Sequence, residues 1–508
     1  MAWTASMLLS VTVSAQIQTD VIETCSIPVG HRSAVYSLEV MVDQSWVASD
    51  VATHSRTSTT SNYFQGQQPS AHWATLGLTH SARVKLTRLT PPQGQTSQQF
   101  STTQTVFQCL PGRYVVDAKT TGLHTLEFTI KQGQKVYVRT DNQQFDTFYL
   151  FANPPKPSSA GANVDYWGPG EHTLPSNYSL PSGKDTLYLD RGAWVRGTVN
   201  VTASNGFSQL RIVGPGVLSG ELDSWEAVSN LTWPGPVFHS MVYCDPAASP
   251  QHSFSMDGPT VVASPMYTFF LQSMSGQKTF SNTHVISPWT YNTDAFNVGS
   301  RANISDCFAF NNDDTIHGEY VNLPYNGTYY DLNVSRCVFA GRHPFLIGYG
   351  YFTQSASNKY ATISSCDVVL DLNGAWFSPF NAMIDGRPPQ NGNPTVQITN
   401  QVYRDIKIYG NVYRLFNLRN VDTSWGWDDG TDPLPCGNLK TCVFENIELL
   451  GTQQQKSILR GSDYGTDTRG DMGYLEFRNL VINGVRVTNA NQWQYFDIDW
   501  ATVSVNFR

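Results

Sequence analysis

The sequence predicts an all-β protein in which an N-terminal β-sandwich is followed by a right-handed parallel β-helix. Charged residues make up only 14% of the 508 residues, whereas Gly (39), Tyr (24) and Trp (13) are plentiful, and this balance favours strands and turns over charged helices. A single globular core stops growing near about 250–300 residues, but a solenoid grows by stacking coils. Short strands without a 3.6-residue apolar period recur to the end of the chain.

The chain begins with a segment typical of an export signal. Residues 1–15 contain the apolar run Met7–Leu9 and end in the small-residue triplet Val13–Ala15, so we expect a signal peptide there. The alternative is a frayed or truncated terminus, because no basic residue precedes the apolar run.

Residues 16–153 have the pattern of a β-sandwich. Short alternating segments such as Val35–Val42, Ala82–Leu86 and Leu126–Ile130 are separated by turns rich in Gly, Pro, Ser and Thr. Residues 154–163 are rich in Pro, Ser and Gly, which is typical of a linker. We therefore place the second domain at residues 164–508.

A repeated signature within this second domain predicts the solenoid. The segments Ile304–Phe310, Val334–Ala340 and Ile363–Val369 each carry a cysteine at the same position, and these cysteines lie 30 and 29 residues apart. That interval suits one coil with a small buried residue on each rung. The alternative is a large sandwich in which the spacing is coincidental.

Charge and hydropathy narrow the range of partners. A net charge of −8 argues against nucleic-acid binding, which normally requires a basic face. After residue 15 no apolar stretch approaches about 18 residues, so we expect no membrane span. Nothing in the sequence indicates an oligomer, and we expect a monomer.

Glycosylation sequons and cysteines favour a secreted, extracellular protein. Sequons are used only in a secretory compartment, and the eight cysteines suit an oxidising environment, where Cys436–Cys442 is spaced as a closed disulfide loop. No Cys-x-x-Cys or His-rich cluster indicates zinc, so we expect neither a metal nor another cofactor. The six sequons begin at Asn177, Asn200, Asn230, Asn303, Asn326 and Asn333.

A cluster of aspartates stands out against the sparse charge. Asp294 lies 19 residues before the pair Asp313 and Asp314, about one short coil, so stacking of the coils would bring the three carboxylates together. Adjacent Asp313 and Asp314 would point to opposite sides of a regular strand, so a local bend is required. The alternatives are a solvated turn and a Ca²⁺ site.

Crowded carboxylates with aromatic neighbours suit glycosidic-bond cleavage. That reaction needs one protonated carboxyl near the leaving oxygen and one carboxylate that activates water or attacks the sugar. Aromatic rings add apolar faces on which sugars rest. Trp376 and Trp425, farther along the chain, could also stack on sugars, and the alternative is that they pack within loops. The residues expected to contact substrate are Trp289, Tyr291, His317, Tyr320, His343 and Trp376.

The order Asn292–Asp294 followed by Asp313 and Asp314 resembles the polygalacturonase-like β-helix glycosidases. The resemblance is closer to glycoside hydrolase family 49, the dextranases and isopullulanases, in which a β-sandwich precedes the helix. It extends from about Phe148 to His343. Similar stretches outside the aspartates are Phe148–Pro154, Leu187–Gly197, Gly214–Glu221 and Gly258–Val261.

This resemblance implies an inverting hydrolase. Asp313 would be the general acid, and Asp294 and Asp314 would hold and activate water. Two departures from the family pattern, Ala295 in place of Gly and His317 where a Lys is usual, put the substrate in question. A histidine changes the donor at a sugar contact and titrates near neutral pH.

The sequence favours a neutral α-glucan of the dextran or pullulan type. Polygalacturonases carry an Arg-x-Lys that pairs with substrate carboxylates, and only the partial match Gly341–His343 occurs here. Three alternatives remain open: a polygalacturonase-like hydrolase of an acidic or sulfated polysaccharide, a β-helix polysaccharide lyase, and a glycan-binding protein without catalytic activity.

Overall fold

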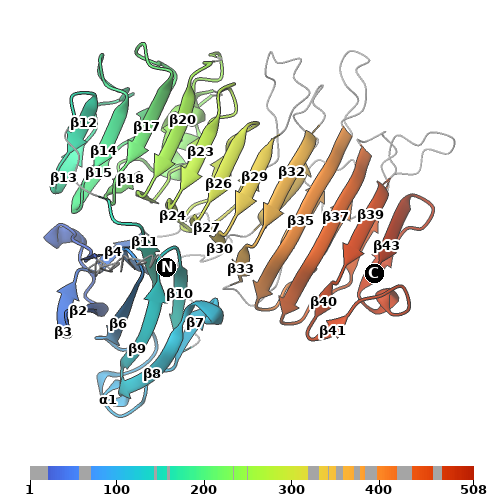
Figure 1. The fold of residues 1–508 in the computed structure, drawn as a ribbon, viewed down its shortest axis with the longest axis horizontal. Coiled ribbons are helices and arrows are strands. Elements are labelled where there is room, and N and C mark those ends of the chain that lie inside the picture. The colour runs from blue at the N-terminus through green and yellow to red at the C-terminus, as the bar shows by residue number, and fades with distance from the viewer. Residues whose placement is uncertain are drawn as a thin grey trace, which may run out of the picture.

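A computed structural model of the chain shows a β-sandwich followed by a parallel β-helix, which confirms the expected fold class (Figure 1). Among the described residues no helix is both long and apolar enough to cross a membrane. The structure describes residues 21–508 except 57–69, 142–145, 157–160, 233, 249, 318–330, 341–342, 350–357, 371–377, 384–396, 420–437 and 462–471.

The sandwich consists of two mainly antiparallel sheets, β3-β2-β6-β9-β8 and β1-β5-β11-β10-β7, with β4 paired to β5. Its helical turns are η1 (Val29–His31), α1 (Ser97–Phe100) and η2 (Gly112–Tyr114). Its strands are β1 (Ile22–Glu23), β2 (Tyr36–Val42), β3 (Ser45–Ser49), β4 (Ala52–Ser55), β5 (Ser70–Leu78), β6 (Ser81–Arg88), β7 (Phe107–Leu110), β8 (Val116–Gly122), β9 (Thr125–Lys131), β10 (Lys135–Thr140) and β11 (Thr147–Asn153).

Each coil of the β-helix contributes two strands to one large bent sheet. The first column contains β12 (Val164–Trp167), β14 (Thr186–Leu189), β17 (Gln209–Val213), β20 (Ser253–Asp257), β23 (Lys278–Ser281), β26 (Ala302–Ser305), β29 (Leu332–Ser335) and β32 (Asn358–Ser364). The second contains β13 (Gly170–Thr173), β15 (Ala193–Arg196), β18 (Val217–Ser219), β21 (Thr260–Val262), β24 (His284–Ser287), β27 (Phe308–Asn311), β30 (Val338–Phe339) and β33 (Asp367–Val369). The last coils add β35 (Gln397–Tyr409), β37 (Asn438–Leu450), β39 (Met472–Arg478), β40 (Val481–Ile482), β41 (Val485–Arg486) and β43 (Val503–Phe507).

A third strand from each coil forms a separate ten-stranded parallel sheet on another side of the β-helix. Helical turns α2 (Trp225–Ser229), η3 (Gly235–His239) and η6 (Gln492–Gln494) lie in the connections. The strands of this sheet are β16 (Val199–Asn200), β19 (Val242–Tyr243), β22 (Phe269–Phe270), β25 (Phe296–Asn297), β28 (Asp314–His317), β31 (His343–Tyr349), β34 (Phe380–Met383), β36 (Phe416–Arg419), β38 (Ser457–Arg460) and β42 (Phe496–Ile498).

The bend between the first two columns is made by one left-handed residue per coil. Asn and Asp adopt positive φ more readily than most residues, which suits them to this corner. Pairing of the preceding strands places these residues in one ladder. They are Asn282, Asp306, Arg336, Ser365, Asp405, Asn446 and Asn479, with φ between 48° and 56°.

The repeated cysteines occupy the next position after this corner. Cys307, Cys337 and Cys366 are buried inside the coils as thiols, and the backbone N–H of Cys307 lies 3.4 Å from Cys337 Sγ. The 30- and 29-residue spacing therefore reflects one rung per coil, as expected. The expectation of disulfide bonds is not supported for Cys25, Cys109, Cys244 or these three cysteines, which are unpaired. Cys436, one half of the expected loop, lies outside the described residues.

The sandwich packs against the outer face of the second column and shares an apolar core with it. Tyr149 and Phe151 of β11 contact Phe308 with ring centroids 5.2 and 5.0 Å apart. Arg113 forms an ion pair with Asp367 across the same interface. Figure 1 shows the sandwich beside the earlier coils, while the C-terminal coils extend past it. The sandwich therefore has a fixed position relative to these coils.

Candidate active site

The three candidate aspartates lie where the second column passes into the ten-stranded sheet. Asp294 ends the turn between β24 and β25, while Asp313 precedes β28 and Asp314 opens it. The N–H of Ala295 donates to the carbonyl oxygen of Asp314 at 2.9 Å. Because Phe296 pairs with Ile316, the same register places Asp294 opposite Asp314 at the strand spacing of about 4.8 Å. The structure therefore brings the aspartates onto adjacent coils.

The three aspartates have different degrees of exposure. Asp294 is 4% exposed, whereas Asp313 and Asp314 are half-buried. Acid-base catalysis on a glycoside needs two carboxyl groups with different roles, and unequal surroundings are how proteins separate such roles.

The bend required between Asp313 and Asp314 is made by Asn311. Its Nδ2 donates to the carbonyl oxygens of Asp313 and Asp314 at 2.9 and 3.0 Å, and its Oδ1 accepts from Thr315 Oγ1 at 2.8 Å. The buried side-chain amide of Asn311 thus holds the backbone of residues 313–315 in a bent conformation. This bend replaces the alternation of a regular strand, which would send adjacent side chains to opposite faces.

Hydrogen bonds of Thr293 hold the turn that ends at Asp294. Thr293 Oγ1 accepts from the N–H of Asn312 on the next coil at 3.0 Å and donates to the carbonyl oxygen of Ser287 at 2.8 Å. Thr290 Oγ1 donates to the carbonyl oxygen of Ser264 on the preceding coil at 3.2 Å. Three consecutive coils are therefore joined directly beneath the aspartates.

The coils on both sides of the aspartates place further residues in line with them. His343 pairs in register with Asp314. On the preceding coil Thr268 N–H donates to the carbonyl oxygen of Asp294 at 2.8 Å, so Tyr267 stands opposite Asp294. Tyr267, Asp294, Asp314 and His343 form a ladder across four coils, which we call the site ladder. Tyr267 was not among the residues expected from the sequence.

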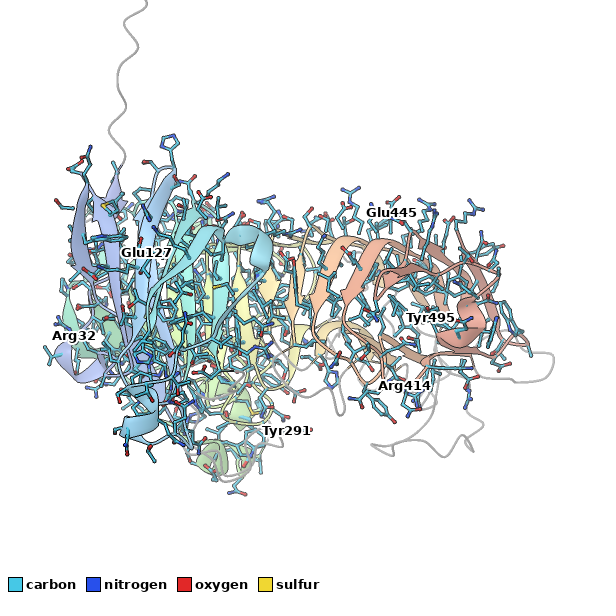
Figure 2. All side chains as sticks on the ribbon, turned by 90° about the horizontal axis from the view of Figure 1, so that it is seen from below. Arg32, Glu127, Tyr291, Arg414, Glu445 and Tyr495 are labelled. Atoms are coloured by element: carbon cyan, nitrogen blue, oxygen red, sulfur yellow. The ribbon has the colours of Figure 1, made fainter. Side chains whose placement is uncertain are left out.

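An aromatic pair lies beside the site ladder. Tyr291 is half-buried, and its ring meets that of Trp225 of α2 edge-on at 6.1 Å and 76°. Figure 2 shows Tyr291 on the same side of the β-helix as Arg414. The strand register places Arg414 in line with the site ladder, two coils after His343. Sequence reasoning missed Trp225, because 66 positions separate it from Tyr291 and only the coil geometry brings them together.

The expectation that Trp289 stacks on a sugar requires correction. Its side chain is 1% exposed and belongs to the core shared with the sandwich, where His54 meets its ring edge-on at 4.9 Å. A buried ring offers no face to a sugar, so we assign Trp289 to packing.

The remaining candidates for substrate contact lie outside the described residues or have side chains that are not described. His317 ends β28 and pairs with Leu346, but its side chain is not among those described. Tyr320, Trp376 and Trp425 lie outside the described residues. Within the described part of the chain, no group of three His, Cys, Asp or Glu side chains is arranged to hold a metal ion.

Comparisons with known proteins point to one type of enzyme. No protein-family model matches the chain. A dextranase of Arthrobacter globiformis is 26% identical over 172 residues, which cover 31% of this chain and 26% of that protein. A dextranase of Arthrobacter sp. (strain CB-8) is 24% identical over 172 residues, again 31% of this chain and 26% of that protein. The match thus spans about a quarter of each relative.

A solved structure is similar over almost the whole chain. Dex49A from Penicillium minioluteum superposes with a TM-score of 0.63 and 16% identity, covering 95% of this chain and 96% of that one. At this identity the likeness concerns the fold, a sandwich followed by a β-helix. Together with the dextranase matches it supports the resemblance to glycoside hydrolase family 49.

Proposed function

We propose that the protein is a secreted glycoside hydrolase that cleaves a polysaccharide, an α-glucan of the dextran or pullulan type, with inversion of the anomeric centre. The observation that carries the proposal is the stacking of Asp294 against Asp314 on adjacent coils, with Asp313 directly before it. Both relatives identified by sequence are dextranases, which favours an α-glucan.

In this proposal the aspartates divide the two tasks of an inverting hydrolase. Asp313 gives its proton to the glycosidic oxygen as the bond from that oxygen to the anomeric carbon breaks. Asp294 and Asp314 hold a water molecule on the opposite face of the sugar and take its proton as its oxygen bonds to the anomeric carbon. Inversion requires acid and base carboxyls about 6.5–9.5 Å apart, which leaves room for that water.

The polymer would lie across the coils along the site ladder. Tyr267 and His343 flank the aspartates on the preceding and following coils, and Tyr291 with Trp225 adds an aromatic surface beside them. A neutral sugar chain is bound by aromatic rings that stack on the sugar faces and by polar groups that form hydrogen bonds with the hydroxyls.

Secretion is part of the proposal and is supported by the sequons. Asn177, Asn230, Asn303 and Asn333 are exposed, so their side chains are accessible for attachment of an N-linked glycan. Asn200 is half-buried. Deglycosylation of protein secreted from a eukaryotic host, followed by mass spectrometry, tests this part. Protein that stays inside the cell without added sugar would contradict it.

The activity is tested on a panel of dextran, pullulan, polygalacturonate and sulfated algal glycans. We expect reducing ends from dextran or pullulan, and proton NMR of the first products should show the inverted anomer. Asp313→Asn should lose nearly all turnover while it retains affinity for the polymer. Cleavage of polygalacturonate or a sulfated glycan alone would move the substrate to acidic polymers. Products that absorb in the ultraviolet would indicate a lyase, and binding without any cleavage would indicate a glycan-binding protein.

A further inference from the structure

The sandwich contacts the turn that carries Asp294. This turn, residues 288–294, begins after β24 and contains the buried ring of Trp289. His54 of sandwich strand β4 meets that ring edge-on, with centroids 4.9 Å apart and an interplanar angle of 74°. Hydrogen bonds of Thr290 and Thr293 attach the turn to the body of the β-helix. His54 adds a contact to the turn from the sandwich.

His54 is itself held in place from two directions. Strand β4 is antiparallel to β5, with His54 opposite Ala71. The Nδ1 atom of His54 lies 3.8 Å from a carboxylate oxygen of Glu221, and that same oxygen accepts from Ser219 Oγ at 2.9 Å. The ring is therefore clamped between the sandwich and the segment that leads into α2.

A second contact to the same region comes from Arg56, the residue after β4. Arg56 Nη2 donates at 2.6 Å to the carbonyl oxygen of Asp223, which lies two residues before the first residue of α2. Trp225 of α2 in turn meets Tyr291 within the 288–294 turn. Two rings of the turn, Trp289 and Tyr291, therefore lie next to elements that β4 and the following Arg56 contact.

We infer that His54 is a positioning residue of the active site, through which the sandwich holds the Trp289 turn and thereby the carboxylate of Asp294. The inference rests on the proposed hydrolase function. His54 acts through its ring and not through charge, because burial, followed by Arg56 and His31, lowers its pKa to about 4 and leaves it neutral near neutral pH.

The interface contains a matched control for this inference. His31 of the sandwich stacks on Trp194 of β15 at 3.7 Å, and its Nε2 lies 3.6 Å from Glu171. This contact has the same three components as the one at His54, namely a histidine, a buried tryptophan and a carboxylate. Trp194 lies on an earlier coil and is followed by no catalytic aspartate.

The first experiment compares the full-length variants His54→Ala, His54→Phe and His31→Ala. Their kcat and KM are measured on the polysaccharide that the wild type cleaves, and their unfolding temperatures are measured separately. We expect His54→Ala to lower kcat about 10- to 100-fold with KM changed less than threefold, because small misplacements of a catalytic group have effects of this size. His54→Phe should retain at least half of the wild-type kcat, since it keeps the ring. His31→Ala should lower only the unfolding temperature.

Equal losses of kcat in His54→Ala and His31→Ala would overturn the inference, because both would then report interface stability alone. An unchanged kcat in His54→Ala would overturn it as well. A second measurement is independent of activity: hydrogen exchange of a peptide spanning residues 290–297. Faster exchange is expected in His54→Ala and not in His31→Ala. If the wild type cleaves nothing, the proposed function fails, and this exchange comparison still decides whether His54 holds the turn.

Discussion

Asp314 and His343 occupy facing positions on β28 and β31, the strands that two adjacent coils contribute to the ten-stranded sheet. Neighbouring strands are about 4.8 Å apart, so a group bound over the aspartates lies within reach of the imidazole. The expectation that His343 contacts substrate stays a prediction, and this register is the observation that makes it testable.

We expect His343→Ala to lower kcat/KM on the cleaved polysaccharide about 10- to 100-fold, the effect of losing a hydrogen bond of roughly 1.5–3 kcal/mol to the substrate. Steady-state kinetics measures this. The unfolding temperature should change little, because the His343 side chain is half-buried and is not part of the apolar core. His343→Gln, which keeps a donor, should recover part of the loss, and wild-type kinetics in His343→Ala would remove this residue from the site.

Thr293 gives a test of the support beneath Asp294. We expect Thr293→Val to lower kcat at least about tenfold and stability by about 1–3 kcal/mol, because the buried N–H of Asn312 loses its acceptor. Urea unfolding and kinetics measure the two effects. Thr283→Val is the control: Thr283 is equally buried and donates to the Ser281 carbonyl oxygen, but it lies at the corner of the coil. Its stability loss should come without a loss of kcat.

The architecture and the aspartate cluster could be predicted because each depends on spacing along the chain. A cysteine every 29 or 30 residues reports the length of a coil, and the 19-residue interval from Asp294 to Asp313 reports a shorter coil at the site. Parallel stacking converts such intervals directly into contacts. The signature also marks the corner, since each of the three cysteines follows a left-handed residue.

The parts that could not be predicted depend on contacts between the two domains. Trp289 has the sequence context of a sugar-binding ring, yet it is buried in the core shared with the sandwich, where it meets His54, 235 positions earlier in the chain. Trp225 and Tyr267 reach the site through turn geometry and strand register, for which the sequence carries no local signal. Disulfides were expected from the number of cysteines, the expected oxidising compartment and the Cys436–Cys442 spacing, whereas the described corner thiols fill the interior of successive coils.

The ion pair between Arg113 and Asp367 joins the sandwich to β33. Asp367 Oδ2 accepts from Arg113 Nη2 at 2.6 Å, and the Asp367 side chain is fully buried while that of Arg113 is 40% exposed. Burial raises the pKa of Asp367, and Arg113 opposes that rise. Removal of the cation would leave a buried carboxylate with less compensation.

We therefore expect Arg113→Met to lower the free energy of unfolding by about 3 kcal/mol, and the double variant with Asp367→Leu to recover most of this loss. Denaturant unfolding of the single and double variants measures both. Arg83→Met, which breaks the more exposed Arg83–Glu127 pair within the sandwich, should cost less than about 1 kcal/mol. A double variant no more stable than Arg113→Met would contradict this account.

His54 predicts a specific loss of stability in mild acid. Burial, with smaller contributions from Arg56 and His31, lowers its pKa from 6.5 to about 4, whereas the unfolded chain binds the proton at the ordinary pKa. The part of the free energy of unfolding that depends on His54 is therefore fully present above pH 6.5 and decreases as the pH falls to about 4. In this range the unfolded chain binds a proton at His54 and the folded protein does not. The shift corresponds to roughly 3 kcal/mol. Burial also lowers the pKa of other histidines, among them His72 and His284, so the measurement is the difference between wild type and His54→Phe in denaturant unfolding at pH 7, 5.5 and 4. The wild type should lose more stability than the variant between pH 7 and 4 by about this amount, and parallel curves for the two proteins would show that His54 is not held neutral in the fold.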